Sequence, residues 1–306
     1  MDSPSLNRRG FLIGGLAGAL TMTAAGTTGL RLFDSSRASA GTGFVVDVTG
    51  DYEFTDSATG CRVSVQVRNG IRRIRANGLP NHSHGSFPNA SVSPQSYDFS
   101  LPTAPSRGGG TALTIPQPFG IAVNGVLFDP LAAEWWNNDP AWHYNALGGG
   151  VPLFLDTNNA HVQPTGAYHY HGIPTGLRES MPTTRHSPLI GWAGDGFPVY
   201  LNRGYRKPRK KSSGLTRLTS SYRLRSGTRS GGPGGRYDGQ FLSDYQYVAK
   251  SGDLDENNGR FQVTPEYPGG TYCYILTGSF PVIPLRLEGP LADSFVRRPG
   301  AGAPPR

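Results

Sequence analysis

Apolar and polar residues alternate between residues 61 and 76, which is the first clear pattern along the chain. Three valines recur at every second position from Val63, the period of a strand that buries one face. Asn69 and Gly70 lie in the middle of this stretch, and an Asn-Gly pair favours the tight turn of a hairpin. The pattern therefore predicts two antiparallel strands joined at Asn69 and Gly70.

A second hairpin is predicted within residues 119–128. Two apolar runs flank another Asn-Gly pair there, at positions 124 and 125. The Tyr-rich segments at 241–250 and 271–276 also have the composition of strands. Residues 131–147, around Glu134, are expected to include a short helix.

Composition favours the same class of fold. The chain has 43 glycines and 26 prolines among its 306 residues, and both residue types are poor helix formers. Its 14 tyrosines and 14 phenylalanines can fill a core between sheets. We expect an all-β or mainly β protein, with a single β-sandwich or barrel-like domain over residues 41–288, long loops and at most short helices.

The first 40 residues have the pattern of an export signal. Arg8 and Arg9 precede an apolar stretch diluted by Gly and Ala, and a small-residue cleavage site ends at Ala40. The stretch is weaker and shorter than the roughly 20 apolar residues of a membrane-spanning helix. The adjacent arginines indicate a twin-arginine signal, residues 1–40, so the expected partner is the twin-arginine export machinery. The alternative is an uncleaved tether or tail.

If the signal is cleaved, the mature protein is periplasmic, secreted or attached to the cell surface, with no transmembrane span. The twin-arginine route exports folded proteins, many of which acquire a metal or cofactor before export. The signal therefore raises the expectation of a bound metal in this chain.

Positive charge is concentrated in one segment of a chain whose net charge is +8. Residues 203–236 contain eleven Lys or Arg and no Asp or Glu, and they are otherwise rich in Gly, Ser and Thr. This composition predicts a flexible basic insert. It either attracts an anionic cell-surface polymer or is a solvated loop, and its few aromatic residues do not indicate specific nucleic-acid binding. The Pro- and Gly-rich residues 289–306 are expected to form a loose tail.

The two cysteines, Cys61 and Cys273, lie near opposite ends of the expected domain. Export permits a disulfide between them, and so long a loop would gain stability from closure. The alternative is two buried free thiols. Two cysteines cannot form a four-cysteine metal site.

Three of the seven histidines lie in one short segment, His161 to His171. Residues 164–166 favour a turn, and a three-residue loop centred on Thr165 places His161 directly opposite His169. His171 lies two residues further along and shares the face of His169. The tyrosines on either side of His169 would point to the opposite face and pack inward. A two-residue loop would instead shift the pairing and separate His161 from the others.

Three neutral imidazoles on one face suit a divalent transition metal. Zinc is the first expectation and copper or iron the second, because imidazole binds all three and because three histidines with an open position are typical of catalytic zinc. Two alternatives remain open. The histidines and aromatic residues form a hydrogen-bonded cluster that only stabilises the hairpin, or the histidines transfer protons or bind a ligand without metal.

The other histidines are weaker candidates. His82 lies in a loop bounded by Pro and Gly and is expected to provide a fourth ligand, with a water in that position as the alternative. His84 and His186 are expected to be exposed, whereas His143, beside a tryptophan, is compatible with either a buried or an exposed position.

Two acidic residues are candidates for catalysis. Asp195, in a tight Gly-Asp-Gly turn, and Glu134, beside two tryptophans, are expected to orient a ligand histidine or to act as a general base. For each, a purely structural role is the alternative. Residues 253–259 have oxygens at alternate positions, but their glycine is displaced and a closing glutamate is missing, so calcium is not expected.

The segment from Tyr168 to His171 has the letters YHYH, the tetrapeptide after which the YHYH domain family is named. Further segments also resemble that family and occur in the same order: residues 77–82, 120–130, 161–166, 191–198, 237–239, 244–245 and 254–272. The resemblance thus covers residues 60–290, and it implies an exported or surface-associated protein. The basic segment 203–236 and Cys273 depart from the family pattern.

Two classes of function follow. One is a metal-dependent hydrolase or oxidoreductase, with metal ligands at His161, His169, His171 and His82. The other is a non-catalytic cell-surface module, either structural or binding glycans through its four tryptophans, Trp135, Trp136, Trp142 and Trp192. A serine-nucleophile elbow and a phosphate-binding glycine loop are both missing from the sequence.

Overall fold

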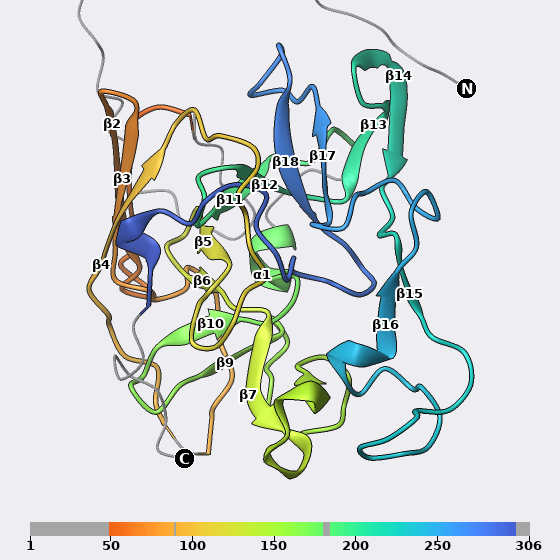
Figure 1. Cartoon of the computed structure of the whole chain (residues 1–306). Coiled ribbons are helices and arrows are strands. Elements are labelled where there is room, and N and C mark those ends of the chain that lie inside the picture. The colour runs from red at the N-terminus through yellow and green to blue at the C-terminus, as the bar shows by residue number, and fades with distance from the viewer. Residues whose placement is uncertain (1–48, 89, 180–183, 298–306) are drawn as a thin grey trace, which may run out of the picture. The chain divides into compact units, whose positions relative to one another are not determined.

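The computed structural model describes residues 49–88, 90–179 and 184–297, and these form a mainly β structure (Figure 1). Within these ranges the only α-helix is α1, Thr175–Glu179, and the other helical segments are single 3-10 turns. No helix in the described part of the chain is long and apolar enough to cross a membrane. The expected signal peptide, residues 1–40, lies outside the described ranges, so it stays a prediction.

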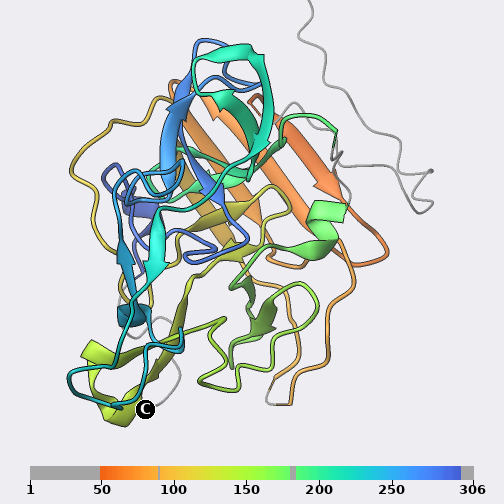
Figure 2. The same cartoon turned by 90° about the vertical axis from the view of Figure 1, so that its right-hand side faces the viewer.

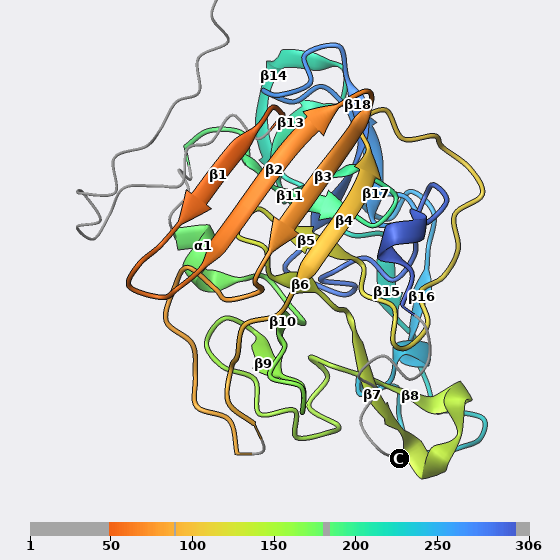
Figure 3. The ribbon, with the colours of Figure 1, turned by 90° about the vertical axis from the view of Figure 1, so that its left-hand side faces the viewer.

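A four-stranded antiparallel sheet forms one layer of the fold, in the order β1-β2-β3-β4 (Figure 3). Its second and third strands are the predicted first hairpin, and both Asn69 and Gly70 have the positive φ that this tight turn requires. Along each strand the inward side chains are buried and the outward ones are largely exposed. The strands are β1 Tyr52–Thr55, β2 Arg62–Arg68, β3 Ile71–Ala76 and β4 Tyr97–Pro102.

An eight-stranded mixed sheet forms the second layer, in the order β17-β18-β12-β11-β5-β6-β10-β9. The predicted second hairpin is confirmed as the antiparallel pair of β5 and β6. The β10·β6 and β12·β18 pairs are parallel. The strands are β5 Gly120–Ala122, β6 Leu127–Phe128, β9 Ala160–Val162, β10 Tyr168–Tyr170, β11 Leu189–Ala193, β12 Pro198–Leu201, β17 Gly259–Gln262 and β18 Thr271–Leu276.

The two sheets share one apolar core, which confirms the expected mainly β class. Trp192 of the large sheet is fully buried, and its ring stacks on that of Tyr52 at 6.4 Å between centroids. The sheets approach closely at Gly125, where an added Cβ would lie 2.5 Å from Cβ of Ala76. Only glycine therefore fits this turn, whose φ of +81° also disfavours other residues.

The short helix expected within residues 131–147 is present only as single 3-10 turns, and Glu134 and Trp135 lie in a strand. The segment instead contains β7, Leu131–Trp135, and β8, His143–Asn145, joined by the 3-10 turns η2, Trp136–Asn138, and η3, Pro140–Trp142. Asn137 has a positive φ, and Pro140 cannot donate a backbone hydrogen bond, so a continuous helix cannot form. Trp135 remains partly exposed here.

The basic segment 203–236 is ordered rather than flexible. It forms the hairpin of β13, Arg203–Lys207, and β14, Lys210–Arg217, followed by β15, Tyr222–Leu224, which pairs with β16, Tyr245–Tyr247 (Figure 2).

A buried ion pair fixes the later part of this segment. The guanidinium of Arg229 donates to both carboxylate oxygens of Asp244, at 2.8 and 2.6 Å, beside the 3-10 turn η4, Leu242–Asp244. Burial by itself would raise the pKa of Asp244, but Arg229 and two backbone N–H groups hold that pKa below its usual value. The expectation of a flexible insert failed because composition does not reveal this distant partner.

The expected loose tail is packed as far as residue 297. Phe295, in the 3-10 turn η5, Asp293–Phe295, is fully buried, and its ring centroid lies 4.3 Å from that of Phe99. Ser294 exchanges two hydrogen bonds with the backbone of Ser100. Residues 298–306 lie outside the described ranges.

Cys61 and Cys273 are buried free thiols, the second of the two alternatives. Cys61 donates to the backbone carbonyl of Asn124, and Cys273 accepts from the side-chain amide of Gln262. Burial raises the pKa of each thiol to about 12. Both therefore stay protonated and inert at neutral pH.

Candidate metal centre

The hairpin of β9 and β10 carries the histidine cluster in the predicted register. His161 pairs with His169, and Val162 pairs with Tyr168. The turn is closed by the backbone N–H of Gln163, which donates to Ala167 at 3.0 Å, and that of Gly166, which donates to Gln163 at 2.8 Å. The three-residue loop expected around Thr165 is thus confirmed.

The tyrosines of the segment face the opposite side, as predicted. Tyr168 and Tyr170 are fully buried, and the hydroxyl of Tyr168 donates to the carboxylate of Asp156 at 2.7 Å. On its other edge β10 pairs in parallel with β6. Because β10 is held on both edges and on its tyrosine face, the histidine face is fixed in position.

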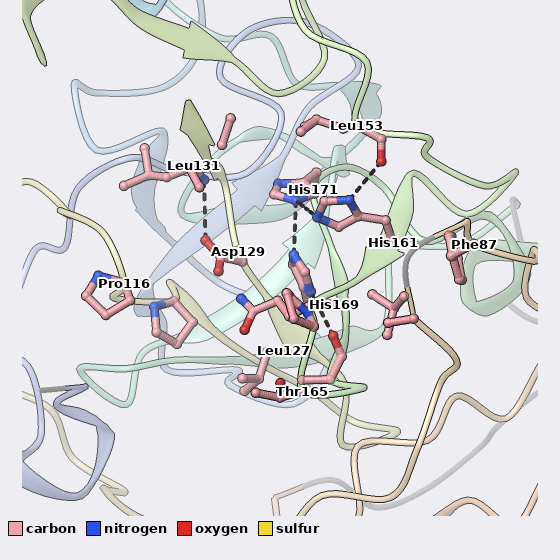
Figure 4. A pocket seen from close by; sticks show the side chains of 18 of the residues that line it. Phe87, Pro116, Leu127, Asp129, Leu131, Leu153, His161, Thr165, His169 and His171 are labelled. Carbon is pink, nitrogen blue, oxygen red and sulfur yellow. Dashed lines mark hydrogen bonds between the residues drawn. The ribbon is translucent and has the colours of Figure 1, made fainter. Parts of the chain in front are cut away.

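The three imidazoles converge at their Nε2 atoms (Figure 4). Nε2 of His171 lies 3.1 Å from Nε2 of His169 and 3.1 Å from Nε2 of His161. The nitrogens available as ligands all lie within 4.8 Å of one another. Two imidazole nitrogens bound tetrahedrally to one zinc at about 2.1 Å would be roughly 3.4 Å apart. The cluster is therefore close to the dimensions of a metal site.

Backbone carbonyls orient two of the rings. Nδ1 of His161 donates to the carbonyl of Leu153 at 2.8 Å, and Nδ1 of His169 donates to the carbonyl of Ala167 at 3.1 Å. Since a carbonyl can only accept, each of these rings has its proton on Nδ1 and a lone pair on Nε2. This is how proteins fix the tautomer of a metal-binding histidine.

The third ring, His171, can be satisfied at Nε2 in two ways, by donating a proton to a neighbouring ring or by binding a cation. Nε2 of His171 faces two lone pairs and can donate a proton to only one of them. If it does so, the lone pair on its own Nδ1 is buried, and no described residue donates a hydrogen bond to it. A cation at the convergence point would satisfy the three Nε2 lone pairs at once, whereas Nδ1 of His171 lacks a hydrogen-bond partner among the described residues in either tautomer.

The electrostatics keep the rings neutral, which is the form that binds metal. Burial and the neighbouring His161 lower the pKa of His169 to about 3. Burial and the other two rings lower the pKa of His171 well below its usual value. Burial also lowers the pKa of His161, although the Leu153 carbonyl and Glu134 oppose the shift. Protons therefore do not compete with a metal at neutral pH.

A cavity of about 590 Å³ opens beside the three histidines. Its walls are mostly apolar, and they include the exposed ring of Phe154 and the side chains of Leu127 and Leu131. Three charged residues reach into it: Asp129, Glu134 and Arg297. The cavity has the size and the mixed lining of a small-molecule site.

Of the two predicted acidic residues, only Glu134 lies in this cavity. Asp195 is buried elsewhere, in the turn between β11 and β12, where it accepts from the Tyr274 hydroxyl and from the backbone N–H groups of Phe197 and Gly289. Asp195 is therefore structural, and its expected role beside the histidines is wrong. The sequence correctly predicted a turn at Asp195, but a turn motif does not indicate at which end of a sheet the turn lies.

His82 is also not a ligand, and the expected fourth protein ligand is wrong. Its Nδ1 donates to the carbonyl of Ser83 at 2.9 Å, and its Nε2 accepts from the hydroxyl of Tyr170 at 2.7 Å. It thus lies on the tyrosine face of β10, away from the convergent nitrogens. Any fourth position is open to the cavity.

The remaining histidines lie outside the cluster. His84 is exposed, as expected. His186 is buried, contrary to expectation, because it packs edge-on against Tyr200. His143 is partly buried, and its Nε2 lies 2.6 Å from the carbonyl of Ala132.

The segment 253–259 is organised as a turn. The carboxylate of Asp255 accepts hydrogen bonds from the backbone N–H groups of Asn257 and Gly259 and from the hydroxyl of Tyr272. The carboxylate oxygens of Asp255 therefore accept hydrogen bonds that stabilise this turn.

Asp129 is the residue of the site that sequence analysis missed. It follows β6 directly, and its backbone N–H donates to the carbonyl of Tyr170 at 2.8 Å, next to His171. Its carboxyl is enclosed by protein except toward the cavity, and burial raises its pKa to about 7. Such a group can exchange a proton near neutral pH. Only the parallel β10·β6 pairing brings it here, and no local pattern predicts that pairing.

A family model with the description "YHYH protein" matches residues 98–289, which is more than half of the chain. The matched span includes the whole histidine hairpin, Asp129 and Glu134. No match was found among curated proteins, and none among solved structures.

Proposed function

This chain belongs to the YHYH protein family. From the geometry of its histidine cluster, we propose that it binds a divalent transition metal through His161, His169 and His171. Zinc is the first expectation and copper or iron the second. The observation that carries the proposal is that Nε2 of His171 lies 3.1 Å from Nε2 of both His169 and His161. Backbone carbonyls leave the lone pairs of those two rings on Nε2. Nitrogen ligands in this number suit zinc, copper and iron better than calcium or magnesium.

If the centre is catalytic, we favour hydrolysis as its reaction over oxidoreductase chemistry. When bound, such a metal acidifies a coordinated water to a pKa of about 7 and polarises a carbonyl. The three histidines leave a position open toward the cavity, and the apolar walls would exclude bulk water from a bound substrate. Glu134 is placed to accept a proton there. Oxidoreductase chemistry is the alternative if the metal is copper or iron.

Metal content tests the proposal directly. The mature protein, purified without a polyhistidine tag, should carry about one transition-metal ion per chain by elemental analysis. The variant His169→Ala should lose that metal, because it removes a ligand with a buried, oriented nitrogen. His84→Ala is the matched control, since His84 is exposed and outside the cluster, and it should keep its metal.

Two results would count against a metal-binding function. One is substoichiometric metal in the purified protein even after incubation with zinc, copper or iron. The other is full metal content in His169→Ala, which would show that the ion binds somewhere else. In either case the histidines would only stabilise the hairpin.

A further inference from the structure

The β13–β14 hairpin concentrates positive charge that nothing in the described structure neutralises. Residues 203–217 contain no Asp or Glu. None of their basic side chains forms an ion pair with any residue in the described ranges. The exposed basic residues are Arg203, Arg206, Lys207, Arg209, Lys210, Lys211 and Arg217.

The strand register makes this charge costly. Arg203 pairs with Arg217, and Lys207 pairs with Lys210, so like charges face one another directly across the hairpin. Directly opposed side chains start about 5 Å apart, and like charges at that spacing are destabilising. The hairpin is therefore less stable by itself than the same hairpin with neutral side chains would be.

Three of the four other basic residues of the segment, Arg223, Arg225 and Arg229, use their side chains within their own loop in the described structure, and only Arg236 does not. Arg229 is held by Asp244 and Asp238, and the guanidinium of Arg223 donates to the backbone carbonyls of Ser220 and Ser251. These residues stabilise their own loop. The contrast identifies the β13–β14 hairpin as the part whose charge is available to a partner.

The hairpin is also rigidly attached. Tyr205 is buried on its inner face, and the carbonyl of Tyr205 accepts from the guanidinium of Arg260. Arg209, in the turn, lies over the ring of Phe261 at 4.6 Å. A rigid attachment means that the cationic side chains are already in place when a partner arrives, which lowers the entropy cost of binding.

The hairpin lies far from the histidine cluster. The β13–β14 hairpin lies at the top of the folded unit, whereas β9 and β10 lie in the lower half of the views (Figures 1 and 3). A partner at β13–β14 would therefore leave the cavity open.

We propose that the β13–β14 hairpin is a binding surface for an anionic polysaccharide. Repeated carboxylate, sulfate or phosphate groups along such a chain would lie between the opposed cations and remove their repulsion, and arginine forks pair well with these groups. The only aromatic residue of the hairpin, Tyr205, is buried, so no ring is free to stack on nucleobases. The export expected from residues 1–40 also favours a polysaccharide over nucleic acid.

Heparin, a sulfated polysaccharide, is a suitable probe for this surface. We expect the full mature protein to bind it with an affinity that falls as salt rises. The triple variant Arg203→Gln, Arg206→Gln, Arg217→Gln should bind roughly 10-fold or more weakly, since each exposed ion pair contributes up to about 1 kcal/mol. Its thermal stability should stay the same or rise, because a like-charge pair is removed.

A second triple variant is the control for net charge. Arg62→Gln, Arg178→Gln and Arg236→Gln also remove three exposed arginines, and all three lie outside the hairpin. This variant should bind heparin within about twofold of the unmodified protein, apart from a small long-range effect. Equal weakening in the two triple variants would overturn the proposal, because it would show that net charge alone attracts heparin. Tighter hairpin-dependent binding to a DNA duplex than to heparin would overturn the choice of partner.

Discussion

Glu134 shares the cavity with three neutral imidazoles, and this placement gives the site one exposed carboxylate besides the enclosed Asp129. Its negative charge opposes the lowering of the His161 pKa by burial. It is not a ligand in the histidine cluster. If the histidines bind the proposed metal, a carboxylate in the same cavity would be able to accept a proton from a reacting water.

We therefore expect Glu134→Gln to separate metal binding from reaction. The variant should keep its metal, because the three imidazoles are unchanged. Hydrolysis of a simple activated ester, p-nitrophenyl acetate, should slow by about 100-fold or more, the usual effect of losing a general base. An unchanged rate, or a rate that survives removal of the metal with a chelator, would show that Glu134 has no such role.

Single residues also show how far the sequence predicts the site. His161, His169 and His171 were found because one short turn, with the expected three-residue loop, fixes their relative positions. His82 and Asp195 were misplaced because their positions depend on contacts with Tyr170 and Tyr274, far away in the chain. Local spacing carries no information about such contacts.

The β9–β10 hairpin is the element on which the proposed metal site depends. Its register places His161 opposite His169, and a shift of one residue would send His161 to the other face. Gly166 holds that register, with a φ of +82° in the turn. An added Cβ there would lie 2.9 Å from Cβ of Ser93 and 3.1 Å from the carbonyl of Ser91, so the turn has no space for a larger residue.

Gly166→Ala should therefore weaken both stability and metal binding. The positive φ and the contacts with Ser91 and Ser93 together should cost about 1–3 kcal/mol, measured by chemical unfolding. Metal occupancy should fall, because relief of the strain shifts the turn and the histidines with it.

Gly70→Ala is the control for backbone strain alone. Gly70 has a similar φ of +77° in the β2–β3 turn, and nothing lies within 4 Å of an added Cβ. This variant should lose less stability and keep its full metal content. If the two variants kept the same metal content, the turn at Gly166 would not control the site.

Elements with a strong local signal were predicted, and elements that depend on distant partners were not. The Asn-Gly turns of β2–β3 and β5–β6 predict their hairpins from the turn and the residues directly beside it. The basic segment was expected to be flexible, yet Arg229 meets Asp244 and orders it. Composition records how many charges a segment has and not whether each finds a partner.

In the folded unit as a whole, the proposed metal site and the cationic β13–β14 hairpin are well separated, with the hairpin at the top and β9 and β10 in the lower half of the views (Figures 1 and 3). The mainly β class follows from the many glycines and prolines and from the strand patterns. The strand order of the large sheet does not, because its parallel β10·β6 and β12·β18 pairs join segments well separated in sequence. The same parallel pairing brings Asp129 beside His171 and completes the cavity.

The most direct test of the account is anomalous X-ray scattering from crystals of the mature protein, recorded at the absorption edge of the bound metal. We predict a single strong anomalous peak about 2.1 Å from Nε2 of His161, His169 and His171, with its open side toward the cavity and Glu134. Crystals with no anomalous peak at this point after soaking in zinc, or with the three rings turned away from one another, would contradict a metal centre in this protein.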